Sequence, residues 1–169
     1  VMYKNFPLFS FIELNINEIC NRKCPFCPRV NPKVYPNQNI YMNMEIVRTI
    51  ADQLKDLNFT GIVNISGTGE PLLTKYIVKE FGDRNIHVEI VTNGDTLTKK
   101  TGPQLVKDIY KAGLKQFVVS MYDGPEQIEY FNNLFNSCNI DKSLYSLRDR
   151  WYDESEDYGL LYTNRAGKL

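Results

Sequence analysis

Short apolar runs alternate with helix-period segments along most of the chain. Residues 9–16 (FSFIELNI) alternate apolar and polar side chains with a period of two, which is typical of a strand with one buried face. Three later apolar runs, at residues 61–66, 87–92 and 117–122, predict further strands. Segments with the period of a helix follow the four strands, over residues 43–57, 72–81 and 103–112 and from Pro125 onward.

Capping and turn residues mark the ends of the predicted helices. Asn43 is suited to begin a helix that runs to Leu57, because its side chain can accept a bond from a free backbone N–H of the first turn. Pro103 suits the first turn of a helix that reaches Ala112, and Gly113 is typical of a helix end. The apolar positions expected on one face are Ile46, Ile50, Leu54 and Leu57 in the first helix, and Ile128, Phe131, Leu134 and Phe135 in the last.

The hydrophobic pattern weakens after the last of these helices. Residues 144–150 and 160–164 are two further candidate strands, separated by the acidic loop at residues 153–157. Four strand–helix units followed by two strands predict an α/β fold with a parallel sheet and right-handed crossovers. The pattern does not decide whether this sheet is open or curled into a partial barrel.

Three unusual loops follow the first three predicted strands. The triplet Cys20, Cys24 and Cys27 comes after the first strand, residues 67–71 (GTGEP) after the second, and the turn dipeptide at residues 93–94 after the third. Because parallel strands place their carboxyl ends at one edge of the sheet, we expect these loops to lie together and to form the site. The polar loop at residues 28–43 is too long for an ordinary connection and is therefore a further candidate for function.

Composition narrows the classes of function. The formal net charge is zero, from 20 basic and 20 acidic residues, and no basic stripe stands out, so nucleic acid is not the expected partner. No apolar run approaches the length of a membrane span, and the N-terminal residues lack the profile of a signal peptide. We therefore expect a cytoplasmic protein without a membrane partner, in which thiols stay reduced and free to bind metal.

The spacing of the cysteines favours an iron–sulfur cluster with one open iron. Three thiolates hold three irons of a cubane and leave the fourth iron without a protein ligand, whereas clusters that only carry electrons usually have four protein ligands. A structural zinc site is the alternative, and it requires a fourth ligand, for which the chain offers Cys138 or the lone His87. Cys138 is otherwise expected to be a small buried hydrophobic residue, and His87 to be structural.

The motif C-x3-C-x2-C, with the aromatic Phe26 just before its last cysteine, resembles the radical S-adenosylmethionine (SAM) enzymes. Residues 67–71 match the glycine-rich Glu-Pro element of that superfamily, and the resemblance covers most of residues 10–122. It implies a partial (β/α) barrel of about six mostly parallel strands with outer helices. It also implies a [4Fe–4S] cluster on the three cysteines, with the amino and carboxylate groups of SAM chelating the open iron.

The resemblance assigns the glycine-rich turn to the cofactor. Gly67 and Gly69 allow the backbone to approach a ligand closely, so that carbonyls of the turn accept bonds from the ammonium group of SAM. Thr68 stands where glycine is common in relatives, which changes little if backbone atoms make the contacts. For Glu70 two interpretations stay open, a role in the site or a carboxylate placed favourably at the start of the second predicted helix. Pro71 rigidifies the entry to that helix.

Other cofactor contacts are also implied by the resemblance. Phe26 is expected to pack against the adenine, to cover the cluster from water, or both. Ser120 stands where relatives place a polar contact to the ribose or the methionine carboxylate, with a serine satisfied inside its strand as the alternative. Arg148 is a candidate for the cofactor carboxylate, with a solvated strand face as the alternative. Asn21 and the surrounding backbone are plausible hydrogen-bond donors to the cluster sulfurs.

The implied chemistry is reductive cleavage of SAM to methionine and a 5′-deoxyadenosyl radical, which removes hydrogen from a substrate that the sequence does not identify. A small molecule or a peptide is expected as substrate, and a reduced flavodoxin- or ferredoxin-type protein as electron donor. Residues 1–169 are expected to form one core domain, either a truncated barrel or a fragment of a longer chain. In some relatives such a core leads into a SPASM-type domain with auxiliary clusters. A non-catalytic electron carrier and a zinc-stabilised binding module are the rival functions.

Overall fold

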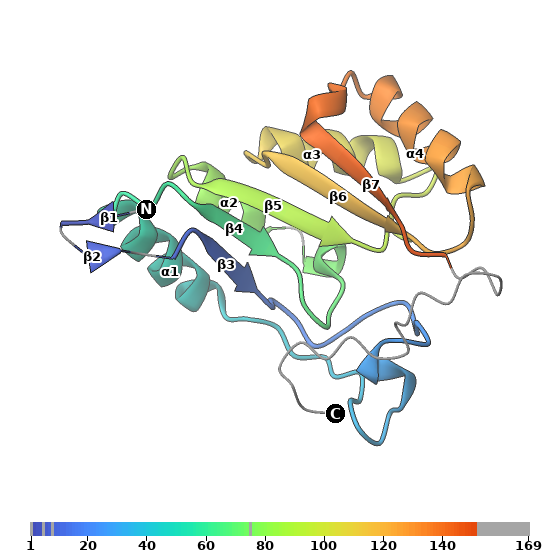
Figure 1. The fold of residues 1–169 in the computed structure, drawn as a ribbon, viewed down its shortest axis with the longest axis horizontal. Coiled ribbons are helices and arrows are strands. Elements are labelled where there is room, and N and C mark those ends of the chain that lie inside the picture. The colour runs from blue at the N-terminus through green and yellow to red at the C-terminus, as the bar shows by residue number, and fades with distance from the viewer. Residues whose placement is uncertain (1, 5, 8, 75, 152–169) are drawn as a thin grey trace.

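A parallel sheet of five strands organises the computed structural model, which describes residues 2–4, 6–7, 9–74 and 76–151. The strands stand in chain order, and each is joined to the next by a crossover that carries a helix (Figure 1). The predicted parallel α/β fold is therefore confirmed. The sheet strands are β3 (Phe11–Leu14), β4 (Ile62–Ile65), β5 (His87–Thr92), β6 (Gln116–Met121) and β7 (Tyr145–Asp149).

The last two expected strands have different outcomes. The strand expected at residues 144–150 is β7, which pairs in parallel with β6. The strand expected at residues 160–164 lies outside the described residues. A short antiparallel hairpin of β1 (Met2–Tyr3) and β2 (Phe6–Pro7) precedes the sheet and has no counterpart among the expected elements.

Helices follow the strands close to the expected bounds. They are α1 (Met44–Asp56), α2 (Ile77–Gly82), α3 (Gly102–Lys111) and α4 (Glu126–Ser137), with short 3-10 turns η1 (Pro28–Val30), η2 (Pro71–Thr74) and η3 (Lys142–Leu144). Asn43 caps α1 as expected, because its side chain accepts a bond from the backbone N–H of Glu45 at 2.8 Å. None of the helices in the described part of the chain combines the length and the apolar character needed to cross a membrane.

Two details of the helix predictions are wrong. Ile46 is 53% exposed, and Val47 and Ala51 are buried in α1 instead, while Leu54 is buried as expected and Ile50 is partly buried against the core. The helix expected at residues 72–81 is divided into η2 and α2. Its first turn is tightened because the backbone N–H of Leu73 bonds to the carbonyl of Glu70 at 3.2 Å, three residues back.

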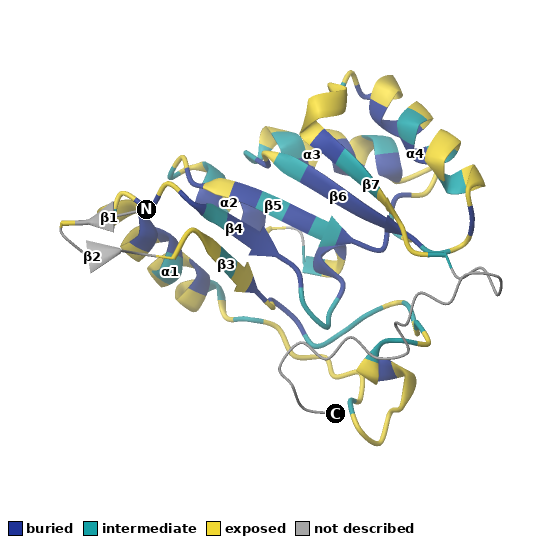
Figure 2. Ribbon diagram, viewed as in Figure 1, coloured by how far each residue is buried: buried dark blue, intermediate teal, exposed yellow. Residues whose placement is uncertain are grey.

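The two faces of the sheet differ in chemistry. Buried residues concentrate in β4, β5 and β6 and on the sides of the helices that pack against them (Figure 2). Phe117 of β6 packs against the rings of Tyr110 in α3 and Phe135 in α4, so its face of the strand meets the helices. Side chains alternate along a strand, so Ser120 points to the opposite, open face.

Polar residues lie in register across this open face. Glu13 pairs with Asn64, Asn64 with Glu89, and Glu89 with Gln116, which places four polar residues in one row across β3 to β6. Their neighbours along the strands, such as Val63 and Ile90, are buried on the helix-covered face. We expect a polar row on the face opposite the helices to meet a ligand rather than a core.

Candidate active site

Cys20, Cys24 and Cys27 lie on the loop that leaves the carboxyl end of β3, and all three are free and half-buried. Burial raises the pKa of the Cys20 thiol, and it raises the pKa of Cys24 to about 11. The Cys27 thiol raises both values further, so the three groups are within electrostatic reach of one another. The loop therefore gathers the three thiols at the site edge of the sheet, as the sequence predicts.

The arrangement does not suit a single metal ion. Across the described ranges, no group of three or more His, Cys, Asp or Glu side chains is placed to hold one ion. A cubane makes a different demand, because each thiolate binds a different iron and the three sulfurs need not converge on one point. Three free thiols on one short loop fit that demand, and they are the donor set that iron–sulfur clusters use.

The fourth ligands considered for zinc lie far from this loop. His87 begins β5, at the strand end opposite to the site, about 20 Å away for six residues of strand. Cys138 follows the last residue of α4, about 18 Å along the helix from its start near the site edge. Cys138 is buried, as expected, and its thiol lies 3.5 Å from the carbonyl of Pro103.

The long loop at residues 28–43 fixes the backbone of the first cysteine. The side-chain oxygen of Asn37 accepts a bond from the Cys20 N–H at 2.8 Å, and its side-chain nitrogen donates to the Cys20 carbonyl at 2.9 Å. Asn37 thus satisfies both backbone groups of Cys20, as a neighbouring strand would. These two contacts support the expectation that the loop at residues 28–43 is functional, because they position a predicted cluster ligand.

The glycine-rich turn lies against the segment that precedes the cysteines. Gly67 has a φ of 124°, and a Cβ added there would stand 2.5 Å from the Asn15 side chain. A Cβ on Gly69 would overlap Asn17, and the backbone N–H of Glu70 donates to the carbonyl of Ile19 at 2.8 Å. The turn therefore requires glycine for its own close packing against the cysteine loop.

Thr68 and Glu70 are both occupied by contacts within the protein. The Thr68 hydroxyl contacts the side chains of Asn15 and Tyr35, at 3.2 and 3.0 Å. Glu70 is 2% exposed, and its carboxylate accepts a bond from the backbone N–H of Leu72 at 2.9 Å, the contact expected of a helix-start carboxylate. Direct cofactor contact by either side chain stays a prediction.

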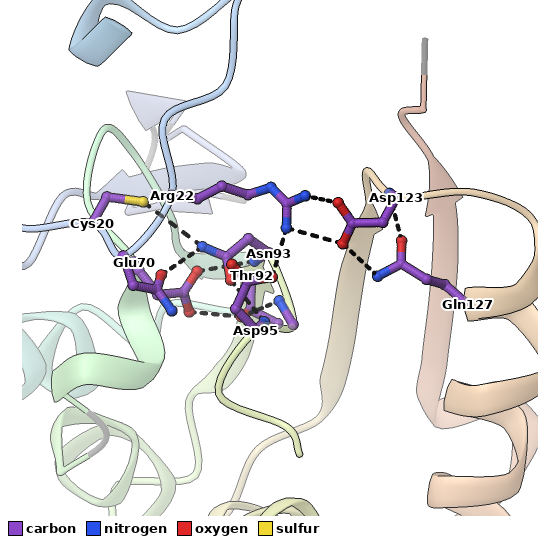
Figure 3. Close-up of polar contacts among 10 residues, drawn as sticks. Cys20, Arg22, Glu70, Thr92, Asn93, Asp95, Asp123 and Gln127 are labelled. Carbon is purple, nitrogen blue, oxygen red and sulfur yellow. Dashed lines mark hydrogen bonds and ion pairs between the residues drawn. The ribbon is translucent and has the colours of Figure 1, made fainter. Parts of the chain in front are cut away.

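Glu70 also fastens the turn to the end of β5 (Figure 3). Its carboxylate accepts bonds from the Thr92 hydroxyl at 2.6 Å and from the backbone N–H of Asn93 at 2.9 Å. Burial raises the pKa of Glu70, and these hydrogen bonds act in the opposite direction by favouring the ionised form. The carboxylate thus joins two of the three loops at the site edge.

Phe26 and Ser120 both contact Tyr122, and Arg148 lies beside Ser120 on the next strand. The ring of Phe26 stacks on Tyr122, with 5.6 Å between the ring centroids. Ser120 is buried on the open face of β6 and pairs in register with Arg148 of β7, which is exposed. The cysteine loop therefore reaches over the open face, next to the strand residues assigned to the cofactor. Cofactor binding by these residues stays a prediction.

Two arginines of the site were not found by sequence reasoning. Arg22, between the first two cysteines, forms ion pairs with Asp95 at 2.7 Å and with Asp123, which tie the loop to the ends of β5 and β6 (Figure 3). It also lies 5.1 Å from the centre of the Tyr122 ring. A charged residue on a polar loop is ordinarily solvated, so the sequence carries no signal for these contacts.

Arg29 is the second of them, and its side chain is 3% exposed. It pairs with Glu18 at 2.9 Å, and it donates to the carbonyl of Pro36 at 3.1 Å and to that of Thr68. The ring of Tyr35 covers the guanidinium at 4.8 Å. A single buried cation therefore joins the long loop, the cysteine segment and the glycine-rich turn.

The family model described as the Radical SAM superfamily matches residues 14–149. The chain belongs to the radical SAM superfamily. The match spans β4 to β7 and the last residue of β3, together with the cysteine loop and the glycine-rich turn. Members of this superfamily use a [4Fe–4S] cluster and SAM, the two cofactors that the sequence motifs imply.

Radical SAM relatives with named activities resemble the chain. It is 32% identical to an S-adenosyl-L-methionine-dependent 2-deoxy-scyllo-inosamine dehydrogenase from Niallia circulans, over 96% of this chain and 61% of that enzyme. It is 34% identical to a GTP 3′,8-cyclase from Thermodesulfovibrio yellowstonii, over 66% of this chain and 34% of the cyclase. The chain therefore spans less than two thirds of the length of these relatives.

A solved radical SAM structure shares the fold. The structure of BtrN in complex with AdoMet and 2-DOIA superposes with a TM-score of 0.68 at 27% identity, covering 85% of this chain and 58% of BtrN. The structure of Streptococcus suis SuiB bound to S-adenosylmethionine superposes with a TM-score of 0.51 at 18% identity, covering 90% of this chain and 42% of SuiB. The parallel sheet with flanking helices, shared with BtrN, is consistent with the partial barrel expected from the resemblance.

Proposed function

We propose that this chain is the catalytic core of a radical SAM enzyme, with Cys20, Cys24 and Cys27 as the ligands of its [4Fe–4S] cluster. The observation that carries the proposal is the convergence of the cysteine loop and the glycine-rich turn at one sheet edge, joined by the bond from Glu70 N–H to the Ile19 carbonyl. With SAM on its open iron, such a cluster supplies one-electron cleavage of SAM to methionine and a 5′-deoxyadenosyl radical.

The residues of the chain have separate tasks in this proposal. Backbone carbonyls of residues 67–69 accept hydrogen bonds from the ammonium group of SAM, and the buried Glu70 carboxylate holds the turn in place. The stacked pair Phe26 and Tyr122 excludes water and offers a surface for the adenine. Ser120 and its neighbour Arg148 contact the ribose or the carboxylate of SAM from the open face.

For the substrate we propose a small polar molecule that loses hydrogen, as a dehydrogenase substrate does. The relative named as a 2-deoxy-scyllo-inosamine dehydrogenase supports this choice, since it is similar over 96% of this chain. The polar row of Glu13, Asn64, Glu89 and Gln116 on the open face also supports it, because hydroxyl and amine groups need such partners when they leave water.

The proposal also needs a source of single electrons and a reducing compartment. A reduced flavodoxin- or ferredoxin-type protein supplies the electron, and a cytoplasmic location keeps the three thiols reduced until iron and sulfide arrive. The alternatives of a non-catalytic carrier and a zinc module lose support from the superfamily match and from the distance of His87 and Cys138 from the cysteine loop.

Anaerobic reconstitution separates these functions. The chain is loaded with iron and sulfide, or with zinc, and is then mixed with SAM and dithionite. Formation of 5′-deoxyadenosine supports the enzyme, a cluster without cleavage of SAM supports the carrier, and tight zinc without a cluster supports the binding module.

For the substrate, 2-deoxy-scyllo-inosamine is added to the active mixture. A product lighter by two hydrogens supports a dehydrogenase, and an unchanged compound rules out this particular substrate.

A further inference from the structure

We propose that the side chain of Asn93 donates a hydrogen bond to the sulfur of Cys20 and thereby raises the reduction potential of the cluster. The side-chain nitrogen of Asn93 lies 3.7 Å from the Cys20 sulfur (Figure 3). This inference rests on the proposed function, because it assigns a positioning and tuning role to Asn93 toward the cluster that Cys20 binds.

The orientation of the Asn93 amide follows from its other contacts. Its side-chain oxygen accepts a bond from the backbone N–H of Asp95 at 2.9 Å, so its nitrogen must face the other way, toward Cys20. The second N–H of that nitrogen donates to the side-chain oxygen of Asn21 at 2.8 Å. Both donors of the amide and its acceptor are therefore engaged, and the amide has one satisfied orientation.

The same contacts change the role expected for Asn21. The sequence suggests Asn21 and the surrounding backbone as hydrogen-bond donors to the cluster sulfurs. In the structure its side-chain oxygen is an acceptor for Asn93, and Asn93 provides the N–H that faces the sulfur. The donor comes from the end of β5, about 70 residues away in sequence, and Asn21 accepts the other N–H of the same amide nitrogen.

Asn93 is held firmly enough to act on the sulfur without moving. It is 8% exposed, and its backbone N–H donates to the Glu70 carboxylate at 2.9 Å. The Thr92 hydroxyl donates to the same carboxylate and accepts a bond from Gly94 N–H at 3.1 Å. A chain of contacts therefore runs from the glycine-rich turn through Glu70 and Asn93 to a cluster ligand.

The direction of the effect follows from charge. Hydrogen bonds to the sulfurs are among the factors that set the potential of an iron–sulfur cluster, together with its net charge and exposure. One-electron reduction adds negative charge to the cluster and its thiolates, so a donor stabilises the reduced state more than the oxidised state. Removal of the Asn93 donor therefore lowers the potential and makes the cluster harder to reduce.

The test is a redox titration of the reconstituted protein, followed by the electron paramagnetic resonance signal of the reduced cluster. In Asn93→Ser a hydroxyl still accepts from Asp95 N–H, but it is too short to reach the sulfur. We expect its reduction equilibrium constant to fall by about tenfold, a shift of about 59 mV for one electron. Asn93→Asp keeps the acceptor and replaces the donor by a charge, so a larger shift in the same direction is expected.

Asn21→Ala is the matched control, because it removes one partner of Asn93, while the bond from Asp95 N–H to the Asn93 side-chain oxygen keeps the donor oriented toward Cys20. Its potential is expected to stay close to that of the parent protein. Potentials of both Asn93 variants equal to the parent, at equal iron content, overturn the inference and leave the proposed function intact. An equal shift in Asn21→Ala also overturns it. A parent protein that binds no cluster overturns the proposed function and the inference together.

Discussion

The Glu70 carboxylate is expected to stabilise the fold as well as the site, and its replacement tests that expectation. It is 2% exposed and accepts three bonds, from Leu72 N–H, the Thr92 hydroxyl and Asn93 N–H. In Glu70→Ala these three buried donors lose their partner. In Glu70→Gln the amide oxygen still serves two of them, and the amide nitrogen faces the third donor.

The magnitude follows from the number of donors left unpaired. An unsatisfied buried donor costs about 1–3 kcal/mol. The cost of burying an ionised carboxylate is regained when it is removed, and this gain offsets part of the loss. We therefore expect Glu70→Ala to lower the free energy of unfolding by about 4 kcal/mol, and Glu70→Gln by about 2 kcal/mol. Domains of this kind are stable by about 5–15 kcal/mol, so both losses are measurable.

Urea unfolding of the metal-free chain under anaerobic conditions, followed by far-ultraviolet circular dichroism, measures these free energies. Glu45→Gln is the matched control, because Glu45 is exposed in the first turn of α1 and is expected to change stability by less than about 0.5 kcal/mol. A Glu70→Gln protein as stable as the Glu45→Gln control refutes the reasoning, since the third hydrogen bond then contributes nothing.

Three further predictions concern the loops around the site. Arg22→Ala removes partly exposed ion pairs to Asp95 and Asp123, which are together worth about 1 kcal/mol. The initial rate of 5′-deoxyadenosine formation is therefore expected to fall about fivefold. An unchanged rate contradicts the role of these ion pairs in placing the cysteine loop. Arg29→Met leaves buried acceptors unpaired and is expected to lower the free energy of unfolding by about 3–5 kcal/mol. The measurement is the midpoint of thermal unfolding of the metal-free chain, which is expected to fall. An unchanged midpoint contradicts a stabilising role of the Arg29 contacts. Burial raises the pKa of Cys24 to about 11, and the thiolate is the form that reacts with alkylating reagents. Alkylation of Cys24 in the metal-free chain is therefore expected to be slow at neutral pH and to accelerate up to about pH 11. A rate that levels off near pH 8 contradicts the burial of this thiol.

Local patterns in the sequence predicted the parts of the site that lie within one short segment. The cysteine triplet and the GTGEP turn each have a fixed spacing. Both follow strands of a parallel sheet, whose carboxyl ends lie at one edge, so the sequence also predicted that they lie together. The strand at His87–Thr92 has the expected bounds, because its period and its turn dipeptide agree. These features depend on neighbours in the chain, so one sequence is enough to find them.

The contacts that hold the segments together were not predictable in this way. Arg22, Arg29, Asn37 and Asn93 act on residues up to about a hundred positions away, and each stands in a polar loop where a solvated side chain is the ordinary expectation. Ile46 was wrongly expected on the buried face of α1 for a related reason. Ile46 and Val47 are both apolar, and only packing against the sheet selects between them.

Quantifying 5′-deoxyadenosine is the most direct test of the central claim that these three cysteines hold a cluster that cleaves SAM. The reconstituted parent, Cys24→Ser and Cys138→Ser are each mixed with SAM and dithionite under anaerobic conditions. We expect the parent and Cys138→Ser to form 5′-deoxyadenosine, and Cys24→Ser to lose both the cluster absorbance and the product. A Cys24→Ser protein that keeps its cluster and forms the product at the rate of the parent contradicts the account.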